Sequence, residues 1–194
     1  MAAEKGEGAG RSADRVIDTP VIDGLRVRLR PLVIEDADAL HAIYSDVELM
    51  TWWSHPPHQT REQTLDRVQK TVAADDWYRW AITLAGDDRA IGTLGAHEKR
   101  QGGVVEIGYS LARVHSGRGI AREAVALMID YLFEVEGHRR VFADTDPDNA
   151  PSNKLLTRLG FTLEGRLRGE WETHIGVRDS LIWGLLREEW SRPV

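Results

Sequence analysis

A glycine-rich turn directly before a long amphipathic stretch is the feature that most constrains this 194-residue chain. Residues 116–121 read Ser-Gly-Arg-Gly-Ile-Ala, and apolar residues then follow at helical spacing as far as Val135. The pattern predicts a helix of about four turns that ends near Gly137. Because the first amide groups of a helix have no partner within it and the helix dipole is positive there, the turn predicts an anion site.

The residues of the turn indicate which anion it would fit. Gly117 and Gly119 allow the backbone to approach a phosphate closely, and Arg118 could add a charge-assisted contact, so a diphosphate is the expected ligand. A P-loop would require Gly-Lys-Ser/Thr, and a dinucleotide fold would require a further glycine within repeating parallel βαβ units. The sequence of this turn meets neither requirement.

Periodicity along the rest of the chain predicts a single α+β domain. Alternating and β-rich segments predict seven strands, at residues 25–30, 79–84, 90–98, 104–111, 140–145, 161–167 and 179–186. Helical spacing predicts four helices, at residues 35–47, 60–72, 121–135 and 151–159. Thr60 is the expected cap of the second helix, whose Leu65, Val68 and Val72 should share one buried face. Short turns join the second, third and fourth strands, which indicates an antiparallel meander within a mixed, mostly antiparallel twisted sheet.

Composition excludes several classes of function. A formal net charge of -6 argues against a nucleic-acid binder and modestly favours a cationic substrate. Without cysteine the chain has no disulfide, thiolate metal site or cysteine nucleophile. No apolar run approaches a membrane span and no secretion signal is recognisable, so we expect a cytoplasmic protein without a membrane partner. Residues 1–17 are expected to form a disordered tail, and residues 18–194 the single domain.

Two segments superficially resemble metal sites. The acidic run at residues 144–148 suggests a calcium loop, but Asn149 stands at the required glycine and Leu155 at the required glutamate. His55 and His58 have no third ligand close in the sequence. We therefore expect no metal.

Two motifs in a fixed order resemble those of a known enzyme family. The glycine turn matches Gln/Arg-x-x-Gly-x-Gly/Ala through Gly119 and Ala121, although Ser116 stands at the first position. Asn149 and Ser152 begin a predicted helix that ends in Leu-Gly-Phe. Shorter matches lie at residues 29–32, 106–109, 163–165 and 176–179. From about residue 25 to residue 190, the chain resembles the GNAT N-acetyltransferases, and among them the ribosomal-protein N-terminal acetyltransferase branch (RimJ/RimL-like).

The resemblance implies a GNAT-like sheet in which the fourth and fifth predicted strands splay apart and hold acetyl-CoA between them. It implies that the end of the fourth strand pairs with the pantetheine amides, that the glycine turn holds the diphosphate, and that Asn149 contacts the arm near the thioester. The implied cofactor-binding residues are Leu111, Ala112, Arg113, Ser116, Gly117, Arg118, Gly119, Ile120, Ala121, Arg122, Asn149 and Ser152.

The resemblance also suggests two catalytic residues. Glu106 would accept the proton of the amine, directly or through water, and Ser152 would hydrogen-bond to the leaving sulfur. Glu106 could instead be an exposed strand residue, and Ser152 could belong to a helix N-cap.

Substrate contacts are implied less specifically, at Trp52, Trp53, Glu170, Trp171 and His174. The two tryptophans before Ser54 could equally roof the core. The seven tryptophans are expected mainly to serve packing, although Trp80, Trp171 and Trp183 could line a substrate cleft.

Three functions follow from these motifs. The leading hypothesis is acetylation of the α-amine of a protein or peptide, because the motif details fit the ribosomal-protein branch best. An amine with a pKa of about 8 is partly neutral and needs only a weak base. A small amine, such as an antibiotic or a polyamine, is the alternative acceptor. A non-catalytic acyl-CoA-binding protein is the third hypothesis, and a monomer and a homodimer are both compatible with the sequence.

Overall fold

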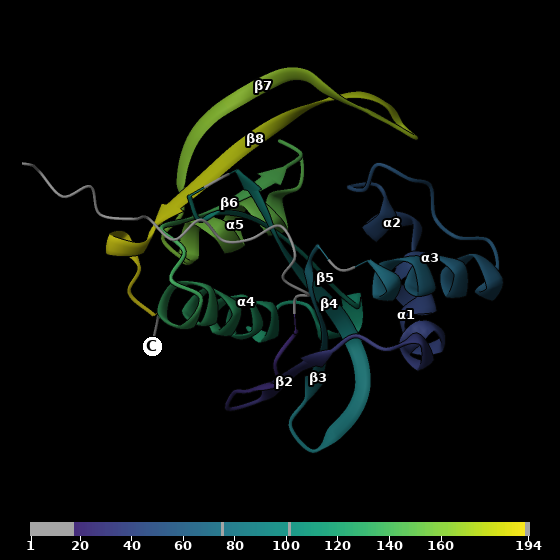
Figure 1. The fold of residues 1–194 in the computed structure, drawn as a ribbon. Coiled ribbons are helices and arrows are strands. Elements are labelled where there is room, and N and C mark those ends of the chain that lie inside the picture. Colours follow the sequence, from purple (N-terminus) through teal and green to yellow (C-terminus); the bar gives the residue numbers. More distant parts are fainter. Residues whose placement is uncertain (1–17, 75, 101, 193–194) are drawn as a thin grey trace, which may run out of the picture.

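The structure is a computed structural model that describes residues 18–74, 76–100 and 102–192 (Figure 1). The expected tail, residues 1–17, lies outside the described residues. Within the described residues the chain forms one mixed sheet of eight strands in the order β1-β2-β3-β4-β5-β6-β8-β7. Only the β5–β6 pair is parallel within this part of the chain, so the predicted single domain with a mostly antiparallel sheet is confirmed.

The elements fall close to the predicted segments. The strands are β1 Ile22–Asp23, β2 Val27–Pro31, β3 Tyr78–Leu84, β4 Asp87–Arg100, β5 Val104–Leu111, β6 Arg140–Thr145, β7 Thr162–Thr173 and β8 Gly176–Leu186. The α-helices are α1 Ala37–Tyr44, α2 Val47–Met50, α3 Arg61–Ala73, α4 Ile120–Asp130 and α5 Ala150–Arg158. Strand β1 was not predicted, because its two residues are too few to show a period.

The helix predicted at residues 35–47 is wrong in one respect, because the chain ends one helix and begins another there. The side chain of Asp46 accepts hydrogen bonds from the backbone N–H groups of Glu48 and Leu49. Asp46 therefore caps α2 as a separate short helix.

The predicted cap of α3 is confirmed, but its predicted buried face is only partly correct. Thr60 accepts a hydrogen bond from the N–H of Gln63 in a capping box. Val68 is fully buried as expected, whereas Leu65 remains 38% exposed and Thr64 is buried instead. The Thr64 hydroxyl meets the Nδ1 atoms of two histidines, His41 and His58, which satisfies this buried polar group.

Helices cover both faces of the sheet, so the central strands are buried on both sides (Figure 1). Trp80 and Ile82 belong to the core under α4 and α5, while Ala81 between them belongs to the core under α1, α2 and α3. Trp80 is fully buried and Trp183 is nearly so. These two tryptophans are therefore core residues, as expected, and the alternative that they line a substrate cleft is wrong.

The predicted splay between adjacent strands is confirmed at β5 and β6. These strands pair only from Val104 to Glu106 on β5 and from Arg140 to Phe142 on β6. Both continue beyond this short parallel ladder, β5 to Leu111 alongside β4 and β6 to Thr145 alongside β8. A wedge therefore opens between β5 and β6 after Glu106.

The hairpin of β7 and β8 is longer than predicted and arches over the sheet toward α2 (Figure 1). Near its tip, Nδ1 of His174 lies 3.2 Å from the carbonyl oxygen of Trp53, in the loop between α2 and α3. The outer parts of the two strands were not predicted, because their residues are largely exposed and show no burial pattern. The contact of His174 with Trp53 brings the tip of the β7–β8 hairpin to the loop that carries the paired tryptophans.

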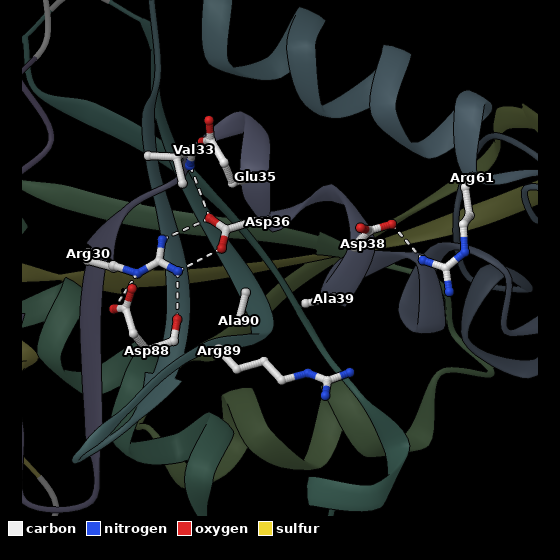
Figure 2. Close-up of a pocket in the computed structure, with 10 residues that line it drawn as sticks. All are labelled: Arg30, Val33, Glu35, Asp36, Asp38, Ala39, Arg61, Asp88, Arg89 and Ala90. Atoms are coloured by element: carbon white, nitrogen blue, oxygen red, sulfur yellow. Dashed lines mark hydrogen bonds and ion pairs between the residues drawn. The ribbon is translucent and has the colours of Figure 1, made fainter.

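A buried ion pair fastens β2 to the start of α1 (Figure 2). The guanidinium of Arg30 donates two hydrogen bonds to the carboxylate of Asp36, at 2.8 and 2.6 Å. It also donates to the carboxylate of Asp88 at 2.8 Å and to the backbone carbonyl of Asp88 at 2.7 Å. The side chains of Arg30 and Asp36 are only 13% and 6% exposed. Arg30 and Asp36 line a hollow together with Glu35 and Arg89, and their ion pair makes this place a structural junction between β2 and α1.

Replacing Asp36 tests this junction. Asp36→Ala should lower the free energy of unfolding by about 3 kcal/mol, because the buried charge of Arg30 loses its main partner. Asp38→Ala is the matched control, since Asp38 pairs with Arg61 at the surface and should cost less than about 1 kcal/mol. Urea unfolding measures both variants, and equal stabilities would contradict the role of Asp36.

Candidate functional site

The glycine turn has the backbone of an anion site. Gly117 and Gly119 have φ values of +75° and +76°, in the region that glycine adopts without strain. Gly119 is the N-cap of α4, and the first bond of the helical turn runs from the N–H of Glu123 to the carbonyl of Gly119. The amides of Ile120 and Ala121 therefore have no carbonyl to bond within the helix. A Cβ added at Gly117 would meet open space, so the turn is accessible to a ligand.

A large cleft joins this turn to the wedge between β5 and β6. Its volume is about 1680 Å³, compared with roughly 300–1,000 Å³ for a typical small-molecule pocket. All the predicted cofactor, catalytic and substrate residues line it, except Ala112, Arg118, Glu170 and His174. The space is sufficient for two substrates that meet at the wedge.

The two predicted catalytic residues lie on opposite faces of the sheet. Val105 and Ile107 belong to the core under α4, so Glu106 between them faces the other side. There its carboxylate oxygen lies 3.1 Å from Nζ of Lys99. Ser152, at the start of α5, instead meets the α4 face of the sheet through Tyr109 of β5. The structure therefore places Glu106 and Ser152 on the two sides of the wedge.

Ser152 and Tyr109 form a hydrogen bond across the wedge. Their oxygen atoms are 2.6 Å apart. Burial raises the pKa of the Tyr109 phenol to about 12, although the hydrogen bond with Ser152 opposes this shift. Tyr109 thus stays protonated near neutral pH and can donate to Ser152. In the sequence, Tyr109 is marked only as the last residue of the motif match at residues 106–109.

Asn149, rather than Ser152, provides the side-chain cap of α5. Its side-chain oxygen accepts a hydrogen bond from the backbone N–H of Ser152 at 3.3 Å. The hydroxyl of Ser152 is thereby left for Tyr109 and the cleft. The Asn149 carbonyl oxygen is engaged in the cap, which leaves its amide NH₂ group as the donor for a ligand.

At the end of β5 and in the segment after it, several backbone and side-chain groups already have partners within the protein. The N–H of Ala112 donates to the carbonyl of Ile91 at 2.9 Å, so this amide is already used by β4. Arg113 forms ion pairs with Asp46 and Glu48 of the α2 region. Hydrogen bonding to Asp46 raises the pKa of the Arg113 guanidinium, which therefore remains charged.

Tryptophans and a carboxylate line the face that Glu106 shares. Asp144 of β6 lies on this face, because its neighbour Ala143 is in the core on the other side. Its carboxylate accepts hydrogen bonds from Nε1 of Trp171, at 2.9 Å, and from the hydroxyl of Ser180. Trp52 and Trp53 contribute to the cleft from the α2–α3 loop.

Among the described residues, no group of three or more His, Asp or Glu side chains is arranged to hold a metal ion. In the same part of the chain, none of the helices combines the length and apolar character that crossing a membrane would require.

An arginine holds the acidic loop that was compared with a calcium site. Arg178 of β8 donates hydrogen bonds to Asp146 at 2.7 and 2.9 Å and to Asp148 at 2.5 Å. The hydrogen bonds from Arg178 lower the pKa of Asp146 despite its partial burial. The guanidinium thus supplies the positive charge in this loop and ties the start of α5, with Asn149 and Ser152, to β8.

The chain belongs to the GNAT acetyltransferases, since the family model described as an acetyltransferase (GNAT) domain matches residues 26–162. A protein of Bacillus licheniformis described as the uncharacterized N-acetyltransferase p20 is 35% identical over 170 residues, which cover 86% of this chain and 96% of that protein. The spermidine N(1)-acetyltransferase of Escherichia coli K12 is 25% identical over 147 residues, covering 75% and 77% of the two chains.

Solved structures agree with this assignment. A probable GNAT acetyltransferase from Chromobacterium violaceum has a TM-score of 0.83, with 27% identity and 98% coverage of both chains. RimJ from Mycobacterium smegmatis, in complex with CoA-disulfide, has a TM-score of 0.75, with 26% identity and 88% coverage of both chains. The chain is therefore an N-acetyltransferase, and acetyl-CoA is its acetyl donor. The open glycine turn and the wedge fit that donor.

Removing Arg178 tests the support of the α5 start. Arg178→Ala should lower the free energy of unfolding at neutral pH by about 2 kcal/mol, through loss of charge-assisted hydrogen bonds. Arg178 holds the pKa of Asp146 below its ordinary value of 3.8, so this stability is complete above that value and is lost as the pH falls through the lowered pKa. Urea unfolding at decreasing pH should show a narrowing difference from wild type. A difference that stays constant, or widens, would count against this role.

Proposed function

We propose that the protein acetylates the α-amine of a protein or peptide chain at the wedge between β5 and β6. The observation that carries this proposal is the separation of Glu106 and Ser152 on opposite sides of the wedge. An amine acceptor can approach Glu106 on one face while the leaving sulfur lies near Ser152 on the other. Acetyl-CoA supplies the acetyl thioester.

Each residue has a distinct role in this proposal. Glu106 takes the proton that the amine loses, directly or through water. Ser152 donates a hydrogen bond to the departing sulfur, and Tyr109 donates in turn to Ser152. The glycine turn, from Gly117 to Arg122, binds the diphosphate at the positive end of α4. No covalent intermediate on the protein is needed, because the amine attacks the thioester directly.

The backbone is proposed to pair with the pantetheine arm at fewer residues than the resemblance implied. The amide N–H of Ala112 already bonds to Ile91, so Leu111 and Arg113 are the positions left for pairing. Arg118 is proposed to contact the diphosphate with its side chain. Its carbonyl oxygen accepts a hydrogen bond from Arg26.

The acceptor is proposed to lie against the tryptophans on the Glu106 face. Trp52, Trp53 and Trp171 supply broad apolar walls, which suit the variable side chains of a peptide. An α-amine also needs little help to lose its proton. A match over 75 residues, 33% identical, to the Escherichia coli K12 enzyme described as a ribosomal protein uS5-alanine N-acetyltransferase supports this acceptor class. Glu170 and His174, at the hairpin tip outside the cleft, are proposed to contact only an extended acceptor.

A polyamine is the second candidate acceptor, and Asp144 is the observation that favours it. Asp144 shares the face of Glu106, and its two hydrogen-bond donors, Trp171 and Ser180, are both neutral. A second ammonium group of a polyamine could bind there while the first reacts near Glu106. The similarity to a spermidine acetyltransferase supports this alternative.

An acceptor panel tests the proposed function. Thiol release from acetyl-CoA is followed with peptides bearing free α-amines, the same peptides with blocked termini and internal lysine, spermidine, and an aminoglycoside. Turnover confined to the free α-amines is the expected result. Turnover confined to spermidine would replace the first acceptor class by the second, and CoA binding without turnover on any acceptor would contradict both.

Substitution of the two proposed catalytic residues tests their roles. Glu106→Gln should lower kcat by about 10- to 100-fold through loss of the base, and Ser152→Ala by about 10-fold through loss of one hydrogen bond. CoA affinity measured by calorimetry should change little for Glu106→Gln. Glu35→Gln, an exposed residue outside the cleft, is the control. Unchanged kcat in both variants would reject the assignment.

A further inference from the structure

Arg26, the residue before β2, forms hydrogen bonds with the glycine turn. Its Nη1 atom donates to the carbonyl oxygen of Arg118 at 2.8 Å, and its Nη2 atom donates to that of Gly119 at 3.3 Å. Its Nε atom donates to the carboxylate of Glu123 in the first turn of α4, at 2.8 Å. One guanidinium therefore contacts three groups around the start of the helix, and neither the motifs nor the family resemblance assigned it a role.

The planarity of the peptide bond gives these contacts a consequence. In a trans peptide, the C=O of one residue and the N–H of the next point in opposite directions. A guanidinium that holds the carbonyls of Arg118 and Gly119 therefore turns the N–H groups of Gly119 and Ile120 away from itself. Both of these residues line the cleft, so their amides are directed toward the space that a diphosphate would occupy.

Glu123 fixes Arg26 in place and would otherwise disfavour an anion. Its carboxylate accepts the backbone N–H of Arg26 at 2.7 Å as well as the side-chain bond. Burial favours the protonated acid, but the hydrogen bonds from Arg26 outweigh it and lower the pKa of Glu123. A carboxylate next to a diphosphate would repel it, and the guanidinium neutralises that charge.

The packing around this contact is close enough to restrict the neighbouring residues. A Cβ at Gly119 would lie 3.2 Å from Nη2 of Arg26. A Cβ at Gly24 would lie 2.7 Å from Leu127 and 2.9 Å from the carboxylate of Glu123. The approach of the N-terminal segment to α4 therefore depends on these two glycines.

We infer that Arg26 is a positioning residue for acetyl-CoA, which orients the amides of the glycine turn toward the diphosphate and offsets the charge of Glu123. The inference rests on the proposed binding of the diphosphate at this turn. It does not depend on the identity of the acceptor, because Arg26 lies behind the turn, outside the residues that line the cleft.

Calorimetry of purified full-length protein with three ligands tests the inference. CoA carries the diphosphate and a 3′-phosphate, dephospho-CoA keeps only the diphosphate, and pantetheine lacks both. Arg26→Ala should weaken CoA and dephospho-CoA alike, by about 10-fold, and should leave pantetheine binding within about 2-fold of wild type. At saturating acetyl-CoA, kcat should also stay within about 2-fold, since the reacting groups are untouched.

Two further variants keep the test decisive. Arg26→Lys retains the charge but loses the fork that spans two carbonyls, so it should weaken CoA by about 3-fold. It decides the question if Arg26→Ala fails to fold. Arg28→Ala is the matched control, because Arg28 follows two residues later and pairs with Asp23 at the surface. Its CoA affinity should equal that of wild type.

The outcomes separate this inference from the proposed site. If wild-type protein binds CoA no more tightly than pantetheine, the turn does not hold the diphosphate and the cofactor site itself is wrong. A second outcome is that wild-type protein binds CoA more tightly than pantetheine while Arg26→Ala and Arg26→Lys show the same ratio of affinities as wild type. In that case only the role of Arg26 is overturned. A loss of kcat without a change in affinity would also overturn it.

Discussion

The rest of the site depends on a parallel ladder that stops after three residue pairs. Val104 to Glu106 pair with Arg140 to Phe142, and the two strands then separate. A continued ladder would leave no space between β5 and β6, because paired strands lie only about 4.8 Å apart. Since the ladder ends, the chain contains a wedge at its centre, and the cleft of about 1680 Å³ forms around it.

The wedge also separates two kinds of chemistry. Alternation along β5 sends Glu106 to one face and Tyr109 to the other, so the group proposed to take a proton and the pair proposed to stabilise the sulfur do not compete. Both helix starts beside the wedge are held by an arginine from elsewhere in the chain, α4 by Arg26 and α5 by Arg178. These contacts hold the two helix starts in place before any ligand arrives, which reduces the entropy lost on binding.

Much of the fold could be predicted because its elements have strong local periods. The strand Arg140–Thr145 was predicted to the residue, and α4 begins one residue before the predicted start. The α-helix itself ends at Asp130, and a π-helical turn, Tyr131–Val135, completes the predicted range. The break at Asp46 was missed because a helical pattern of apolar residues continues through it. The outer halves of β7 and β8 were missed because both of their faces are largely exposed, so no burial pattern marks them.

By itself, the sequence determined the α+β class, the glycine turn at the start of α4 and the candidate pair Glu106 and Ser152, since local spacing and family motifs carry that information. Only the tertiary structure decided that these two residues face opposite sides of the wedge, that Tyr109 meets Ser152 and that Arg26 holds the turn. Arg26 and Arg118 are 92 residues apart, and the alternating arginines of the first strand look alike in sequence. Which of them contacts a distant carbonyl is set by packing between elements.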